Sequence, residues 1–102
     1  MRIEWSDFAR DDLDDLVEYI NKDSALYARQ FGEKVVLATR RLANFPESGR
    51  RIPEADNNSL REIIVQGYRV MYRFEADVVL ILAVMHGSRD LTNPKQKPWE
   101  NR

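Results

Sequence analysis

Hydrophobic and polar positions divide the chain into a short strand, two helices and a group of later strands. Polar and apolar side chains alternate over residues 2–5, which predicts a first strand. Apolar residues then recur every three or four positions, which predicts a helix over residues 7–22. Ser6 offers a side-chain oxygen at the N-cap of this helix, and Asp7 places negative charge in its first turn.

A second helix is predicted over residues 25–45, with Ser24 at its N-cap. Its apolar stripe is formed by Ala28, Phe31, Val35, Ala38, Leu42 and Phe45, and it is widened by Val36, Leu37 and Ala43. Pro46 and Gly49 end the helix. Because few residues separate the two helices, we expect an antiparallel hairpin, and each helix needs a sheet to cover its apolar face.

Three strands are predicted in the second half of the chain, after a polar connection that contains proline and glycine. They span residues 60–65, 68–74 and 78–86, with Gly67 in the first turn and residues 75–77 in the second. The last strand is almost entirely apolar, as expected for a strand with both faces covered. The short links between these strands predict an antiparallel meander.

These elements together predict an α+β fold, in which the helical hairpin packs on one face of a four-stranded antiparallel sheet. The chain has 102 residues, which is the usual size of one domain. We expect residues 1–91 to form that domain. Residues 92–102 form a polar C-terminal tail that is a candidate mobile segment, with Trp99 as its one large anchor.

Composition excludes several classes of function. The chain carries 16 Lys and Arg against 17 Asp and Glu, so it is not a strongly basic domain that holds nucleic acid by bulk charge. It has no Cys and one His, which excludes thiol catalysis and His-rich metal sites, and we expect no metal and no cofactor. No apolar run is long enough to span a membrane, and the acidic N-terminus is unlike a signal peptide. We therefore expect a cytoplasmic protein.

The strand over residues 68–74 separates apolar from basic side chains. One face carries Tyr68, Val70, Tyr72 and Phe74, and the other carries Arg69, Met71 and Arg73, which Arg61 on the neighbouring strand joins if the register permits. This pattern predicts a basic surface on the open side of the sheet, suited to phosphate or carboxylate. The alternative is that these arginines pair with Glu62, Glu75 and Asp77 and only shield the sheet.

His86 is the one imidazole of the chain, at the end of the last predicted strand. It is a candidate general acid or base, and the alternative is a structural role. Ser88 has no second His and no thiol neighbour, which argues against a hydrolase triad. The acidic residues between Asp11 and Asp15 lack the pattern of a calcium loop and fit a helix start with a solvated face.

The order of the elements and several short segments resemble the RelE/ParE toxin superfamily of bacterial toxin–antitoxin modules. The segments are ARDDLDDL over residues 9–16 with Tyr19 and Ile20, LANFPESGR over 42–50, LRE over 60–62, GYRVMYR over 67–73 and VMHGSRDL over 84–91. The FPESGR loop and the HGSRD ending are closest to the ParE branch.

The resemblance implies one of two activities. The ParE branch is implied to poison DNA gyrase by binding, whereas the RelE branch is implied to cut mRNA in the ribosomal A site without a metal. In the nuclease alternative, Arg61 and Arg69 would orient phosphate, Arg89 would stabilise developing charge and His86 would act as general acid or base. Two departures favour the gyrase poison: Ile63 stands where the nuclease pattern has a basic residue, and the C-terminal tyrosine is missing.

Both activities imply a cognate antitoxin, encoded by the neighbouring gene, whose C-terminal segment wraps the toxin. An extended apolar segment would lie in the groove between the helices and the sheet, or add to a sheet edge. Arg61, Met71 and Arg73 are the candidate residues for contact with the antitoxin or the target. A third hypothesis is a partner-binding domain without toxicity.

Overall fold

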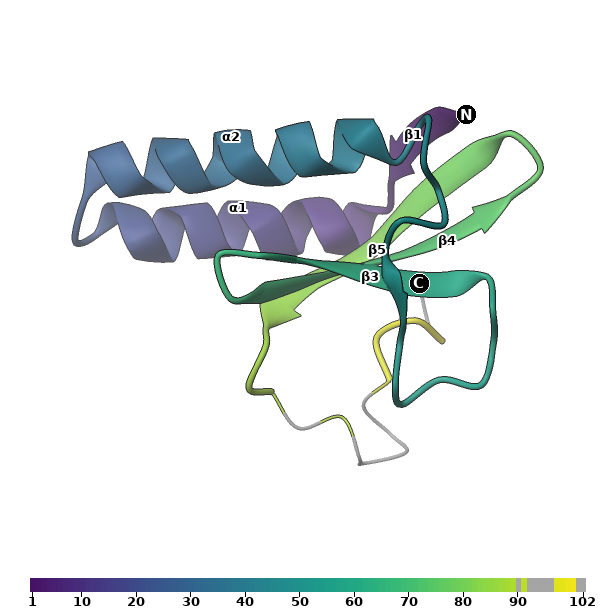
Figure 1. Cartoon of the computed structure of the whole chain (residues 1–102). Coiled ribbons are helices and arrows are strands. Elements are labelled where there is room, and N and C mark those ends of the chain that lie inside the picture. Colours follow the sequence, from purple (N-terminus) through teal and green to yellow (C-terminus); the bar gives the residue numbers. More distant parts are fainter. Residues whose placement is uncertain (90, 92–96, 101–102) are drawn as a thin grey trace.

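The computed structural model describes residues 1–89, 91 and 97–100, and its elements form two layers (Figure 1). Helices α1 (Asp7–Asn21) and α2 (Ala25–Arg41) form a hairpin over one face of a sheet. The strands are β1 (Arg2–Trp5), β2 (Arg50–Arg51), β3 (Leu60–Val65), β4 (Tyr68–Glu75) and β5 (Val78–His86). The predicted α+β class is confirmed. Most of the predicted tail, residues 92–96 and 101–102, lies outside the described residues.

Both helices begin at the predicted caps. Ser6 Oγ accepts a hydrogen bond from the amide of Ala9 at 3.0 Å, which satisfies one of the unpaired donors at the start of α1. Ser24 caps α2 in the same way, through the amide of Tyr27 at 3.2 Å.

The second helix ends earlier than predicted, at Arg41 rather than near residue 45. The residues that follow it form turns, and Leu42, the C-cap, is buried. Phe45 therefore leaves the predicted apolar stripe and is exposed, and so is Leu37. For these two side chains the predicted place in the core is wrong.

The sheet is mixed and has five strands in the order β1-β5-β4-β3-β2. The antiparallel meander of β3, β4 and β5 is confirmed. The prediction of four antiparallel strands is wrong in two respects, since β1 pairs parallel with β5 and β2 adds a short fifth strand beside β3. An alternating pattern marks a strand but not its partner, and β2 is only two residues long, too short for any pattern.

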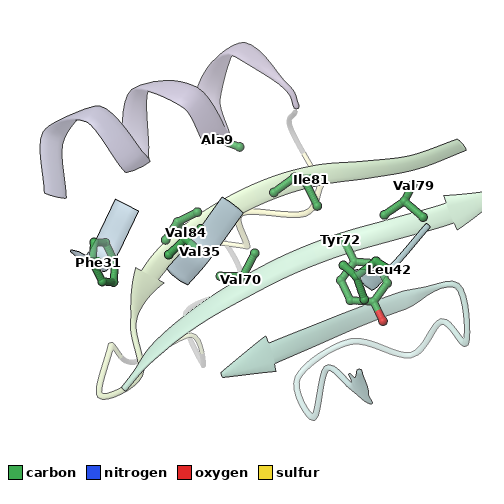
Figure 2. Packing of buried hydrophobic residues seen from close by; sticks show 9 residues of the cluster. All are labelled: Ala9, Phe31, Val35, Leu42, Val70, Tyr72, Val79, Ile81 and Val84. Carbon is green, nitrogen blue, oxygen red and sulfur yellow. The ribbon is translucent and has the colours of Figure 1, made fainter. Parts of the chain in front are cut away.

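The main core lies between the helices and the sheet (Figure 2). Its buried members are Ala9, Phe31, Val35, Leu42, Val70, Tyr72, Val79, Ile81 and Val84. Phe31 lies at one end of this cluster, and Tyr72 lies with Leu42 at the other (Figure 2). The apolar face predicted for β4 is thus the face that meets the helices.

A bulge at Leu82 interrupts β5, because the pairing with β4 shifts there by one residue. The N-cap and the second turn of α1 supply hydrogen bonds to the bulge and to the strand just after it. Ser6 Oγ lies 3.4 Å from the carbonyl oxygen of Leu82, and the amide of Val84 donates to Asp12 Oδ2 at 3.1 Å. The first turns of α1 are therefore anchored to β5 by polar contacts as well as by apolar packing.

Candidate functional site

The sheet face that points away from the helices is covered rather than open. A second group of buried apolar side chains packs there: Ile52, Leu60, Met71, Leu82, Ala83, Met85, Leu91 and Trp99. Both faces of β5 are therefore covered, as predicted from its apolar sequence. The predicted open basic surface is wrong, and Met71 is 0% exposed, so its side chain offers no contact surface to an antitoxin or a target.

Arg69 is buried on this second face and held by two carboxylates. Its Nε donates to Glu62 Oε1 at 2.6 Å, and its two terminal nitrogens donate to the oxygens of Glu54 at 3.0 and 2.7 Å. The bond to Glu54 raises the pKa of Arg69, and the same bond lowers the pKa of Glu54 below its usual 4.5. At 4% exposure, Arg69 has its charge balanced inside the fold rather than presented to a phosphate.

Glu62 is the centre of this polar network. Its side chain is 0% exposed, and its second oxygen accepts from Arg50 at 2.6 Å. The carboxylate thus joins β2, β3 and β4 through two guanidinium groups. The predicted alternative, in which arginines pair with carboxylates, is confirmed for Glu62, and Arg73 lies 3.9 Å from Glu75. The sequence analysis missed Glu54, which lies in the loop before β3.

Arg61 does not join Arg69 and Arg73. It pairs across the ladder with Tyr72, so it lies on the sheet face that meets the helices, and the register excludes the predicted cluster. Its Nε donates to the carbonyl of Asn58 at 3.2 Å, and Nη1 donates to the carbonyl of Gly49 at 3.2 Å. Arg61 therefore holds the loop segments that flank β2.

Tyr72 fixes the loop between α2 and β2. Its hydroxyl donates to the carbonyl of Pro46 at 2.6 Å and accepts from the amide of Gly49 at 3.0 Å. Burial raises the pKa of the Tyr72 hydroxyl above its usual 10.0. No sequence signal marked this contact, since the strand pattern identified Tyr72 only as a core residue.

His86 lies at the exposed end of β5 and faces Tyr68, with ring centroids 5.3 Å apart in an edge-on arrangement. Its Nδ1 accepts from the amide of Ser88 at 3.1 Å and lies 2.6 Å from Ser88 Oγ. An acceptor role for Nδ1 places the proton of the neutral ring on Nε2. Arg89 is exposed just beyond, and its amide donates to the carbonyl of His86 at 3.1 Å.

The four nuclease candidates do not converge. Arg69 faces one side of the sheet, whereas Arg61 and His86 lie toward the other. Their ladder partners Tyr72 and Tyr68 are four residues apart on β4, so about 13 Å separates the two positions along the strand. Among residues 1–89, 91 and 97–100, no three acidic or His side chains form a group that could hold a metal ion.

A candidate surface for binding a partner lies where the helical hairpin meets the β3–β4 turn. A hollow of about 250 Å³ opens there, lined by Ile20, Tyr27, Gln30, Phe31, Lys34, Gln66 and Tyr68. Beside it, β2 pairs only with Arg61 and Glu62 of β3. Within the described part of the chain, residues 63–65 of β3 have no strand on that side, and Ile64 is 53% exposed.

The arrangement of a helical hairpin over a mixed sheet is shared with a solved structure. A solved structure titled "Chromosomal ParDE TA system from P. aeruginosa" is similar over 84% of this chain and 95% of that one, with a TM-score of 0.69 and 18% identity. The profile of the ParE toxin of the type II toxin–antitoxin system parDE matches residues 3–91. The chain belongs to the ParE toxin family.

No curated protein sequence matches the chain. Within the described ranges, no helix is both long enough and apolar enough to cross a membrane.

Proposed function

We propose that this ParE-family toxin acts in the cytoplasm by binding DNA gyrase and trapping it on cleaved DNA, and that a cognate antitoxin neutralises it. The observation that carries the proposal is the state of Arg69. Arg69 is 4% exposed and bound by Glu54 and Glu62, which supports a structural role rather than catalysis.

RNA cleavage is the less favoured alternative. Phosphoryl transfer needs cationic groups that converge on the reacting phosphate and that are not already neutralised. Arg61 donates to backbone carbonyls, and His86 lies at the far end of β4 from it. A toxin that works through its surface needs no such convergence.

The test is a gyrase supercoiling assay with relaxed plasmid, ATP and the purified toxin. We expect loss of supercoiling and accumulation of linear plasmid after the protein is denatured and digested. The variant His86→Gln is the matched control, because it removes the one imidazole at an exposed position and should keep full activity. Absence of any effect on gyrase at high excess would contradict the proposal.

A ribosome-dependent mRNA cleavage assay tests the nuclease alternative. If the toxin cleaves mRNA on ribosomes, and Arg89→Ala or His86→Gln abolishes cleavage, the nuclease alternative replaces gyrase poisoning. If neither gyrase nor mRNA is affected, the chain is a partner-binding domain without toxicity.

For the antitoxin we propose the hollow beside Tyr27 and Tyr68 together with the open edge of β3. An extended apolar segment would add to this edge as a strand, using the backbone groups of residues 63–65 that do not face β4. Lys34 in the hollow favours an acidic residue in the partner. Arg61 and Arg73, both partly exposed, stay candidate contacts.

Co-expression with the product of the neighbouring gene tests this contact. We expect the wild-type toxin to co-purify with it and Ile64→Asp to lose most of that binding, because a charge on the edge of β3 opposes an apolar strand. Phe45→Asp, which changes an exposed apolar residue in the turn after α2, is the matched control and should bind as wild type does. Equal binding by wild type and Ile64→Asp would move the antitoxin to another surface.

A further inference from the structure

The outer face of α2 carries an apolar hollow that the core does not fill. It measures about 380 Å³ and is lined by Gly32, Glu33, Val36, Leu37 and Arg40. Leu37 is 53% exposed at its centre, although its position in the sequence suggested a core residue. Gly32 lies at the edge of the hollow that is nearer to α1, where a Cβ would make an ordinary contact with Val17 at 3.7 Å.

The lining has the geometry of a helix-packing site. Glu33, Val36, Leu37 and Arg40 are spaced i, i+3, i+4 and i+7, so together they surround one hole on the helix surface. Such a hole accepts one large apolar side chain from a facing helix. Leu37 itself projects from the same face and is the right kind of side chain to fill it.

The charges around the hole are self-complementary. Consider two copies of α2 packed antiparallel about a twofold axis that passes between Val36 and Leu37. Glu33 of one copy then lies opposite Arg40 of the other, and the pairing occurs twice by symmetry. On a helix with 3.6 residues per turn, Glu33 and Arg40 lie on the same side of Leu37, which is the arrangement that this symmetry requires.

We propose that the toxin forms an isologous homodimer through α2, in which Leu37 of each copy fills the hole of the other and two Glu33–Arg40 pairs flank the contact. The surface is distinct from the β3 edge proposed for the antitoxin. A single pair of helices buries less area than a stable dimer needs, so the dimer is weak and depends on concentration.

Sedimentation velocity of the full chain, from low micromolar to near millimolar concentration, tests the proposal. We expect wild type to shift from monomer to dimer over this range. Glu33→Arg and Arg40→Glu should each weaken self-association by at least about tenfold, because each places like charges opposite one another. Asp15→Arg, an exposed charge reversal on α1, is the matched control and should dimerise as wild type does.

Mixing the two charge-reversal variants is the decisive measurement. The Glu33→Arg chain then presents two cations to the two carboxylates of the Arg40→Glu chain, so we expect the mixture to dimerise although neither variant does so alone. The proposal is overturned if wild type stays monomeric at every concentration. It is also overturned if single reversals dimerise normally, or if mixing restores nothing. If wild type is monomeric and Leu37→Asp abolishes co-purification with the neighbouring gene product, the hole belongs to the antitoxin.

Discussion

The hydroxyl of Tyr72 and the backbone of Gly49 are fitted to each other. The amide of Gly49 donates to this oxygen at 3.0 Å, and a Cβ at position 49 would lie only 2.5 Å from it. The same hydroxyl donates to Pro46, so one side chain of β4 fixes the whole turn that follows α2. Position 49 accepts only a residue without a side chain as long as Tyr72 stays in place.

Replacing Tyr72 by Phe should lower the free energy of unfolding by about 1–3 kcal/mol, because a buried amide and a carbonyl both lose their partner. Urea denaturation followed by circular dichroism measures this. Gly49→Ala should cost more, since the new methyl group also meets the carbonyl of Glu62 at 2.6 Å. A Phe variant as stable as wild type would show that these bonds contribute little.

Alkaline pH should destabilise the protein through Tyr72. Burial raises its pKa in the folded state above 10.0, so the unfolded chain releases this proton first as the pH rises. The stability due to Tyr72 is complete below pH 10 and is lost as the pH approaches the folded-state pKa. Unfolding free energies of wild type and Tyr72→Phe, measured between pH 8 and pH 11 or so, should therefore converge at the alkaline end.

The ion-pair network predicts a large difference between two arginines of β4. Arg69→Met should cost about 3–5 kcal/mol of unfolding free energy, because it leaves the buried carboxylate of Glu62 with one partner fewer. Arg73→Met is the matched control. Its guanidinium is partly exposed and lies 3.9 Å from Glu75, so the change should stay within about 0.5 kcal/mol. Similar effects of the two substitutions would contradict the structural role of Arg69.

Acid pH tests the contribution of Glu54 to the same ion-pair network. The pKa of Glu54 is lowered by its bond to Arg69, so its contribution is present above pH 4.5 and is lost as the pH falls through the folded-state pKa. Glu54→Gln should therefore be less stable than wild type at neutral pH and lose less stability below pH 4.5.

The packing of α1 on β5 should depend on the carboxylate of Asp12, which the sequence analysis assigned to a solvated face. Asp12→Ala removes the acceptor for the amide of Val84 beside the bulge of β5 and should cost about 1–2 kcal/mol. Asp12→Asn keeps an acceptor oxygen and should recover most of the loss. Asp15→Ala, on the exposed face of the same helix, should change stability by less than about 0.5 kcal/mol. Thermal unfolding of the three variants decides between these roles.

The two hairpin turns predict substitutions of opposite sign. Ala76 has a φ of 49°, which is unfavourable for any residue with a Cβ, so Ala76→Gly should stabilise the protein by about 0.5–1 kcal/mol. Gly67 has a φ of 82° and open space around it, so Gly67→Ala should destabilise by about 1 kcal/mol through backbone strain alone. Midpoints of urea unfolding with unchanged slopes would measure both effects.

The sequence was sufficient to predict those features of the fold that depend on residues close together in the chain. Ser6 and Ser24 marked the helix starts because a cap acts within three residues, and the apolar run of β5 showed that both of its faces are covered. The partner of β1 was out of reach, since strand alternation carries no information on direction or neighbour.

The prediction of a basic site on the sheet was wrong for a related reason. The face on which Arg61 lies depends on the register between β3 and β4, and a shift of one residue would reverse it. Arg69 pairs with Glu54, which lies 15 positions earlier in a loop without a repeating pattern. Neither relationship leaves a trace in residue spacing, so an arginine that closes an internal network looked the same as one that faces a phosphate.

Because β1 pairs with β5, the first strand of the chain cannot join the sheet until the last strand has been synthesised. The hydrogen bond between Ser6, just after β1, and Leu82 of β5 joins residues that are 76 positions apart in the sequence. The strand β1 therefore joins the sheet only after a long loop has closed. At about 5–20 residues per second, the N-terminal strand waits roughly 4–15 s on the ribosome for its partner to be made. Until β5 emerges, the helical hairpin lacks the strand that covers part of its apolar face, so that face stays exposed during synthesis.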